Sequence, residues 1–217
     1  AIAPLILKSG VDAVEIHTTV GRLAEFKKVW QTISPYVDQL KLLAISCTDG
    51  EGVIDYLHSL YDVMAPLDCV NIWQTDGRSM SGDIGSGTTL AAVKLGSKVL
   101  KAKIPGYVQL AGGTNSYTVP KLKSMGLLNQ LTKQTNNFMR ENSDNSHTSG
   151  LGTEASIAGV AYGSYARKLL LPVLQQLEEK EVNVEDVKLT ARKLEEEPTL
   201  LWQAVSLAHE LVSQLKD

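Results

Sequence analysis

The sequence predicts an α/β fold built from parallel β/α repeats. Five short runs are nearly continuously apolar, which is typical of strands covered on both faces of a sheet. Amphipathic stretches of helical period separate these runs, and a strand followed by a helix roughly every 30 residues indicates right-handed β-α-β units. The predicted strands are Val11–His17, Lys41–Cys47, Cys69–Gln74, Gly106–Ala111 and Ile157–Tyr162.

Helices are predicted between and after the strands. The stretch Glu51–Met64 shows the pattern well, because its apolar residues recur every three or four positions on one face. After the fifth strand we expect a helix over Ser164–Glu179 with a bend or boundary near Pro172, and a final helix from about Pro198 that docks on the body of the protein. The other predicted helices are Leu23–Ile33, Gly52–Met64, Thr88–Lys101 and Thr118–Lys133.

Five units are too few to close an eight-stranded barrel. We therefore expect a partial TIM-barrel-like domain over residues 1–175 and a C-terminal helical extension over residues 176–217. The missing strands would come from an upstream segment, from a partner protein or from dimerisation. The chain begins with Ala1 rather than Met, so we expect either a removed leader or the later part of a longer protein.

Composition excludes several classes of protein. Of 217 residues, 43% are hydrophobic and 21% are charged, which fits an ordinary globular domain and argues against intrinsic disorder. A net charge of −3 gives no general attraction to nucleic acid, and no apolar run approaches the roughly 18 residues of a membrane span. The two cysteines, Cys47 and Cys69, cannot by themselves hold a four-thiolate cluster, so we expect buried thiols and no metal or cofactor in this chain.

The loop after the third strand carries the densest functional signal. It runs QTDGRSMSGDIGSG from Gln74 to Gly87 and combines acid, arginine, hydroxyls and glycines ahead of a helix. Such a loop favours an anion such as phosphate. The alternative is that its glycines only turn the chain and that Asp76 and Asp83 cap helices. The candidate ligand-binding residues are Asp76, Arg78, Ser81 and Gly82.

The loops after the last two strands form a second candidate anion site. In (β/α)-barrels these two positions commonly bind phosphate. Double glycines also occur for tight packing alone, and an arginine there can merely decorate a helix. The residues concerned are Gly112, Gly113, Thr114, Gly163, Ser164 and Arg167.

Glu15 and His17 lie on one face of the first strand and predict a polar pocket together with Gln74 and Gln109. Pointing into a barrel, Glu15 and His17 could exchange protons or bind a metal. The alternative is a structural pair, with Arg78 or His17 as the partner of a buried Glu15. No nucleophile triad, Walker loop, zinc spacing or dinucleotide fingerprint is present, so no catalytic residue is assigned.

Five long motifs resemble the carboxy-terminal domain of the light-dependent period family of iron–sulfur proteins, found in cyanobacteria with relatives in plastids. The similarity covers roughly residues 5–175. The matching segments are VDAVEIHTTVGR (11–22), LKLLAISCTDGEGVIDYL (40–57), IWQTDGRSMSGDIGSGTT (72–89), GYVQLAGGTNSYTVPKL (106–122) and IAGVAYGSYAR (157–167).

The resemblance implies a redox-linked regulatory or assembly protein of a photosynthetic compartment. Family members carry a cysteine-rich, ferredoxin-like segment upstream, and in cyanobacteria they are linked to redox input to the circadian clock. The resemblance thus places a 4Fe–4S cluster outside this chain, and it implies the chloroplast stroma or, alternatively, the cyanobacterial cytoplasm. Two other functions stay open: a TIM-barrel enzyme, or degenerate enzyme, acting on a phosphorylated small molecule, and a structural subunit of a larger complex.

Overall fold

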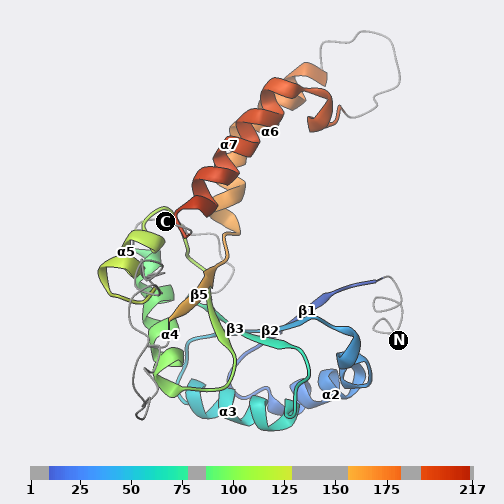
Figure 1. The fold of residues 1–217 in the computed structure, drawn as a ribbon, viewed down its shortest axis with the longest axis vertical. Helices are drawn as coiled ribbons and strands as arrows, with labels where there is room; N and C mark the ends of the chain where they lie inside the picture. The colour runs from blue at the N-terminus through green and yellow to red at the C-terminus, as the bar shows by residue number, and fades with distance from the viewer. Residues whose placement is uncertain (1–9, 78–86, 129–155, 182–191, 216–217) are drawn as a thin grey trace, which may run out of the picture.

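The computed structural model describes residues 10–77, 87–128, 156–181 and 192–215. Within them lies one five-stranded, all-parallel sheet of order β1-β2-β3-β4-β5, which confirms the α/β class (Figure 1). The strands are β1 (Ala13–Thr18), β2 (Leu42–Thr48), β3 (Val70–Asp76), β4 (Tyr107–Ala111) and β5 (Ile157–Val160). The helices are α2 (Leu23–Ile33), α3 (Val53–Met64), α4 (Thr88–Ala102), α5 (Thr118–Ser124), α6 (Ser164–Glu181) and α7 (Pro198–Ser213), with 3₁₀ turns η1 (Ser34–Gln39) and η2 (Leu194–Glu196).

The sequential strand order gives the sheet one covered face and one open face. Crossovers of the same hand between strands laid down in order keep their helices on a single side, as in a barrel. Residues on that side, such as Ile45, Trp73 and Leu110, are buried under α2, α3 and α4. On the other side the side chains of Glu15 and His17 are 39% and 60% exposed. The described sheet is therefore open, and its sequential parallel order does not contradict a partial barrel.

Helix α4 sits very close to the sheet, and glycine permits this. An added Cβ at Gly96 would lie 2.2 Å from Leu110 Cδ2 on β4. At the preceding loop, a Cβ on Gly77 would lie 2.2 Å from the backbone nitrogen of Ala92 in the same helix. The absence of a side chain at these two positions allows α4 to pack directly over β3 and β4.

Helices α6 and α7 form an antiparallel hairpin that projects away from the sheet (Figure 1). Its buried residues make a small core separate from the main one: Val173, Leu177, Leu200 and Ala204. The prediction that the final helix docks on the body of the protein is wrong, because the apolar faces of α6 and α7 cover each other.

Pro172 lies inside α6 rather than at a helix boundary. A proline there leaves the carbonyl of Lys168 without its helical donor. Both residues are exposed, so water can satisfy that carbonyl. The expected boundary between residues 175 and 176 falls within this same helix. The predicted Asn- and Ser-rich excursion over 134–152 lies outside the described residues. No helix among the described residues is long and apolar enough to cross a membrane.

Candidate functional site

Parallel pairing gathers polar side chains on the open face, near the carboxyl ends of the strands. His17 pairs in register with Ser46, Ser46 with Gln74, and Gln74 with Gln109. Because side chains alternate along each strand, these four share one face of the sheet. Glu15 lies two residues before His17 and Asp76 two residues after Gln74, on that same face. We call Glu15, His17, Ser46, Gln74 and Asp76 the open-face cluster.

Hydrogen bonds join the members of this cluster. Glu15 Oε1 lies 3.0 Å from His17 Nε2 and accepts a hydrogen bond of 2.5 Å from Gln74 Nε2. The Ser46 hydroxyl donates to the Asp76 carboxylate. Glu15 is thus partnered by His17, as one of the two alternatives predicted, and also by Gln74. It is partly exposed rather than buried.

Asp76 has the perturbed carboxyl group of the cluster. Burial raises its pKa above the ordinary range, the hydrogen bond from Ser46 and the nearby His17 lower it, and the charge of Glu15 raises it. Burial is the largest of these effects. A carboxyl group held partly toward its protonated form beside an imidazole can exchange protons with a ligand in the same space.

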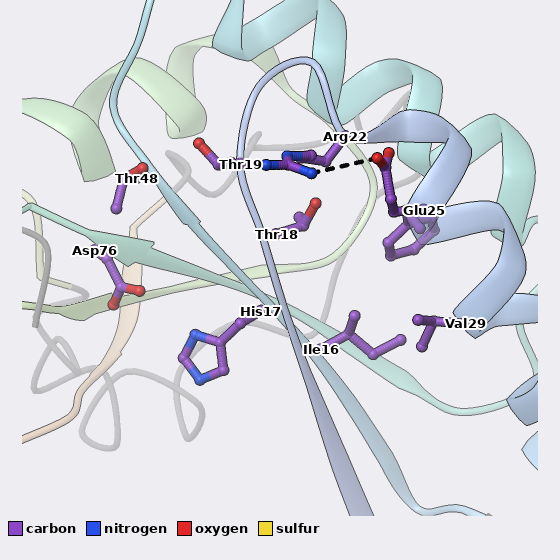
Figure 2. A pocket seen from close by; sticks show the side chains of 10 residues that line it. Ile16, His17, Thr18, Thr19, Arg22, Glu25, Val29, Thr48 and Asp76 are labelled. Carbon is purple, nitrogen blue, oxygen red and sulfur yellow. Dashed lines mark hydrogen bonds and ion pairs between the residues drawn. The ribbon is translucent and has the colours of Figure 1, made fainter. Parts of the chain in front are cut away.

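A pocket of about 390 Å³ wraps the carboxyl end of β1 and reaches the cluster (Figure 2). Arg22 is the cation in its wall, and its Nη1 lies 3.3 Å from Glu25 Oε1. In Figure 2, His17 and Asp76 lie on one side of β1 and Glu25 lies on the other. The lining residues are Ile16, His17, Thr18, Thr19, Arg22, Glu25, Phe26, Val29, Thr48 and Asp76. The pocket therefore offers an exposed cation, hydroxyl groups and a half-buried acid.

Three residues of this region were missed from the sequence: Ser46, Thr48 and Arg22. Ser46 and Thr48 interrupt the apolar run of β2 at alternate positions, which is a readable signal that its carboxyl end faces something polar. Arg22 directly precedes α2 and was assigned no role from the sequence. It lies four residues after the end of β1, so the short loop between β1 and α2 already holds it near the pocket.

Hydrogen bonds within the second candidate site, in the loops after β4 and β5, hold its residues in place. The Thr114 hydroxyl is buried and donates to the carbonyl of Ala161 at 2.5 Å, which ties the loop after β4 to the loop after β5. Gly112 and Gly113 have φ values of 56° and 91°, and Gly113 accepts a 2.7 Å hydrogen bond from the Thr88 hydroxyl. These contacts give the loop a structural role, and ligand binding by its residues stays a prediction.

Gly163, Ser164 and Arg167 lie at the start of α6. Arg167 is exposed and donates to the Ser164 hydroxyl oxygen at 3.0 Å. The Thr114 contact with Ala161 places these residues beside the double-glycine loop, as expected for neighbouring strand ends. Whether they bind an anion stays a prediction.

The predicted ligands Arg78, Ser81 and Gly82 lie outside the described residues. In the part of the chain that the structure describes, no group of three or more His, Cys, Asp or Glu residues could hold a metal ion. Cys47 is buried, and burial, followed by the charges of Asp76 and Asp49, raises its thiol pKa to about 11. Cys69 is only partly buried. A thiol such as Cys47 stays protonated and is a poor nucleophile.

Comparison with known proteins decides the family. The family model described as the light dependent period A C-terminal domain matches residues 5–214. The chain belongs to the light dependent period A family. Light dependent period A of Synechococcus elongatus is 40% identical over 216 residues, covering 100% of this chain and 53% of that relative. The chain thus spans about half the length of the curated relative that it matches. No solved structure matches.

The family match extends the similarity noted from the motifs. The five motifs end at Arg167, whereas the family model reaches residue 214, close to the end of α7. The α6–α7 hairpin is therefore part of what the family model describes, and not an appendage peculiar to this chain.

Proposed function

We propose that this chain is the carboxy-terminal part of a redox-linked regulatory or assembly protein, and that a segment upstream of it completes the barrel. The observation that carries the proposal is the sequential parallel sheet with one open face. A parallel sheet normally has both faces covered. In the described part of the chain, helices cover one side of the five-stranded sheet, and further strands would be needed to close over the other.

The apolar half of the open face supports this proposal. At the amino ends of the strands, Tyr107 is 58% exposed and Val70 is 45% exposed, beside the partly buried Ile72. Tyr107 and Val70 are two residues of the strands themselves, where large apolar groups are normally covered. An interior with apolar residues at the amino ends and polar residues at the carboxyl ends is that of a (β/α)-barrel.

The comparison supports an upstream source for the missing strands. The matching family model describes a C-terminal domain, and the cyanobacterial relative is nearly twice as long as this chain. We propose that the iron–sulfur cluster of the family resides on that upstream segment. We also propose a photosynthetic compartment, either the chloroplast stroma or the cyanobacterial cytoplasm; the source of the relative supports the second.

Co-expression tests the completed barrel. This chain would be produced with the upstream half of the Synechococcus relative, and association measured by co-elution in gel filtration under anaerobic conditions. We expect a one-to-one complex, with iron in the upstream half alone. Tyr107→Lys should weaken the association at least about tenfold, since it places a charge in the closing interface.

Leu90→Lys is the matched control for this experiment. Leu90 is 47% exposed on α4, on the helical side of the sheet. It should leave the complex intact. Failure of the two halves to associate, or equal weakening by the Tyr107 and Leu90 variants, would refute completion of the barrel by this segment.

We further propose that the pocket at the end of β1 binds a small anionic ligand through Arg22. Its hydroxyl-lined wall and exposed guanidinium suit a phosphate group. Inorganic phosphate should raise the melting temperature of the chain by about 2–4 °C at saturating concentration. Arg22→Gln should abolish the rise, and Lys28→Gln on the same helix should not. Loss of the rise in Arg78→Gln instead would assign the anion to the loop after β3.

A second function, that of an enzyme acting on a phosphorylated small molecule, is favoured by Asp76 alone. Its raised pKa and its place beside His17 suit a general acid or base. Turnover of a phosphorylated metabolite, followed by phosphorus NMR, that disappears in Asp76→Asn would favour this function. Binding without turnover would favour the regulatory one.

A further inference from the structure

The α6–α7 hairpin has too little internal core to explain its apolar residues. Its core consists of the buried Val173, Leu177, Leu200 and Ala204, with the partly buried Leu170, Leu194 and Leu207 packed against them. Helices joined only by such a core remain largely exposed on their flanks. Several large apolar side chains of both helices lie on those flanks, each between 43% and 51% exposed: Leu171, Leu174, Val205 and Val212.

These apolar residues share one side of the hairpin. On α6, Leu174 comes one position after the buried Val173, which places it about 100° around the helix from the buried row. Leu171, three positions before Leu174, lies on the same flank. On α7, Val205 and Val212 lie on the corresponding flank of the buried row. Because the helices run antiparallel, these two flanks face the same way. We define the hairpin stripe as Leu171, Leu174, Val205, Ala208 and Val212.

Opposite charges bound the stripe at its two ends. On α6, Arg167, Leu171, Leu174 and Glu178 form one row at spacings of four, three and four residues. Arg167 stands at the base of the hairpin and Glu178 near its tip, about 16 Å apart along the helix. A basic residue near a helix N-terminus and an acidic residue near its C-terminus oppose the helix dipole. The charge order is therefore not explained by the stability of α6 itself.

We propose that the hairpin stripe is the interface of a twofold-symmetric dimer, in which a second copy of the hairpin packs antiparallel to form a four-helix bundle. A twofold axis through the middle of the stripe, between Leu171 and Leu174, brings Arg167 of each protomer opposite the partner's Glu178. The same symmetry places an Arg167–Glu178 pair at each end of the stripe, so the stripe is complementary to itself. The apolar residues between them form the seam of the bundle.

Sedimentation velocity of the full 217-residue chain tests this proposal. Over about 1–100 µM the mass should rise from 23.5 kDa to twice that value. Val205→Lys should weaken dimerisation at least about tenfold. Gln203→Lys is the matched control: Gln203 is exposed on the same helix and lies about 200° of helical turn before Val205, so it points away from the stripe and the variant should dimerise like the wild type. Circular dichroism would confirm that each variant keeps its helices.

A charge exchange distinguishes the antiparallel arrangement from other dimers. Arg167→Glu and Glu178→Arg should each weaken dimerisation about tenfold by placing like charges opposite each other, and the double variant should recover to within about threefold of wild type. A chain monomeric at every concentration would overturn the proposal, as would equal loss in Val205→Lys and Gln203→Lys. A double variant no better than the single variants would overturn the antiparallel pairing. A stripe protected from hydrogen exchange only when the upstream half is added would assign it to that segment instead.

Discussion

Within the open-face cluster, Asp76 is the residue whose carboxyl pKa is raised by burial. It lies at the end of β3, accepts a hydrogen bond from Ser46 and shares its space with His17 and Glu15. Its residue type and its position after an apolar run marked it as a candidate from the sequence. The partner Ser46 comes from a different strand, 30 positions earlier, and only the parallel register brings the two together.

The raised pKa of Asp76 predicts how stability depends on pH. The folded state favours the protonated carboxyl, so its contribution is fully present below the unfolded pKa and is lost as the pH rises through the folded pKa. Asp76→Asn keeps an acceptor for Ser46 and removes the charge. It should melt at a higher temperature than wild type near pH 7, and the difference should shrink toward pH 3.

Calorimetry from about pH 3 to 8 measures this difference. Asp12→Asn, which removes one charge from an exposed ion pair with Lys41, controls for the change in net charge. The melting temperature of Asp76→Asn relative to wild type should change with pH in a way that differs from that of Asp12→Asn. A melting temperature of Asp76→Asn below that of wild type near neutral pH would contradict the prediction.

The close approach of Gly77 to α4 predicts a large effect from one methyl group. A Cβ at Gly77 would meet the backbone of Ala92, which cannot rotate away, so Gly77→Ala should cost about 2–3 kcal/mol and lower the melting temperature by about 4–12 °C. Gly87→Ala is the control, since no heavy atom lies within 4 Å of a Cβ there. Thermal denaturation compares the two, and equal melting temperatures would mean that α4 shifts freely.

Among the elements, the strands and the first helices follow the sequence pattern closely. The expected helix Leu23–Ile33 coincides with α2, and the expected strand Lys41–Cys47 differs from β2 by one residue at each end. Apolar runs and helical spacing are local signals, so these elements could be predicted. The helix boundary predicted near Pro172 is wrong. Proline disfavours helix interiors, but an exposed position in a helix tolerates it. The prediction that α7 docks on the body of the protein is wrong, because an amphipathic pattern does not specify which surface covers the apolar face.

The separate core of the hairpin predicts a local loss of stability. Leu200→Ala removes a buried side chain from this small core and should destabilise the hairpin by about 2–4 kcal/mol. Hydrogen exchange should then become faster in α6 and α7 and stay unchanged in β1–β4. Trp202→Ala, two residues away and exposed, should leave hydrogen exchange unchanged both in the hairpin and in the sheet. Faster exchange throughout the sheet would show that the two cores unfold together.

At the scale of the whole molecule, the two cores divide the chain at the start of α6. The main core extends from Ile16 to Ile157 and the second one lies within α6, η2 and α7. A chain ending at Gly163 should therefore keep a single cooperative unfolding transition within a few degrees of the full chain. Loss of that transition in thermal denaturation would mean that the hairpin supports the sheet. The same truncation should abolish any concentration-dependent dimer.

The sequence alone determined the α/β class, the parallel repeat, the positions of the five strands and the family, because nearly continuous apolar runs and long motifs are properties of neighbouring residues. Only the tertiary structure decided that Ser46 bonds Asp76 and that α7 pairs with α6. Each of these depends on which distant segments lie side by side, and pairing across the chain is set by strand order and packing rather than by local spacing.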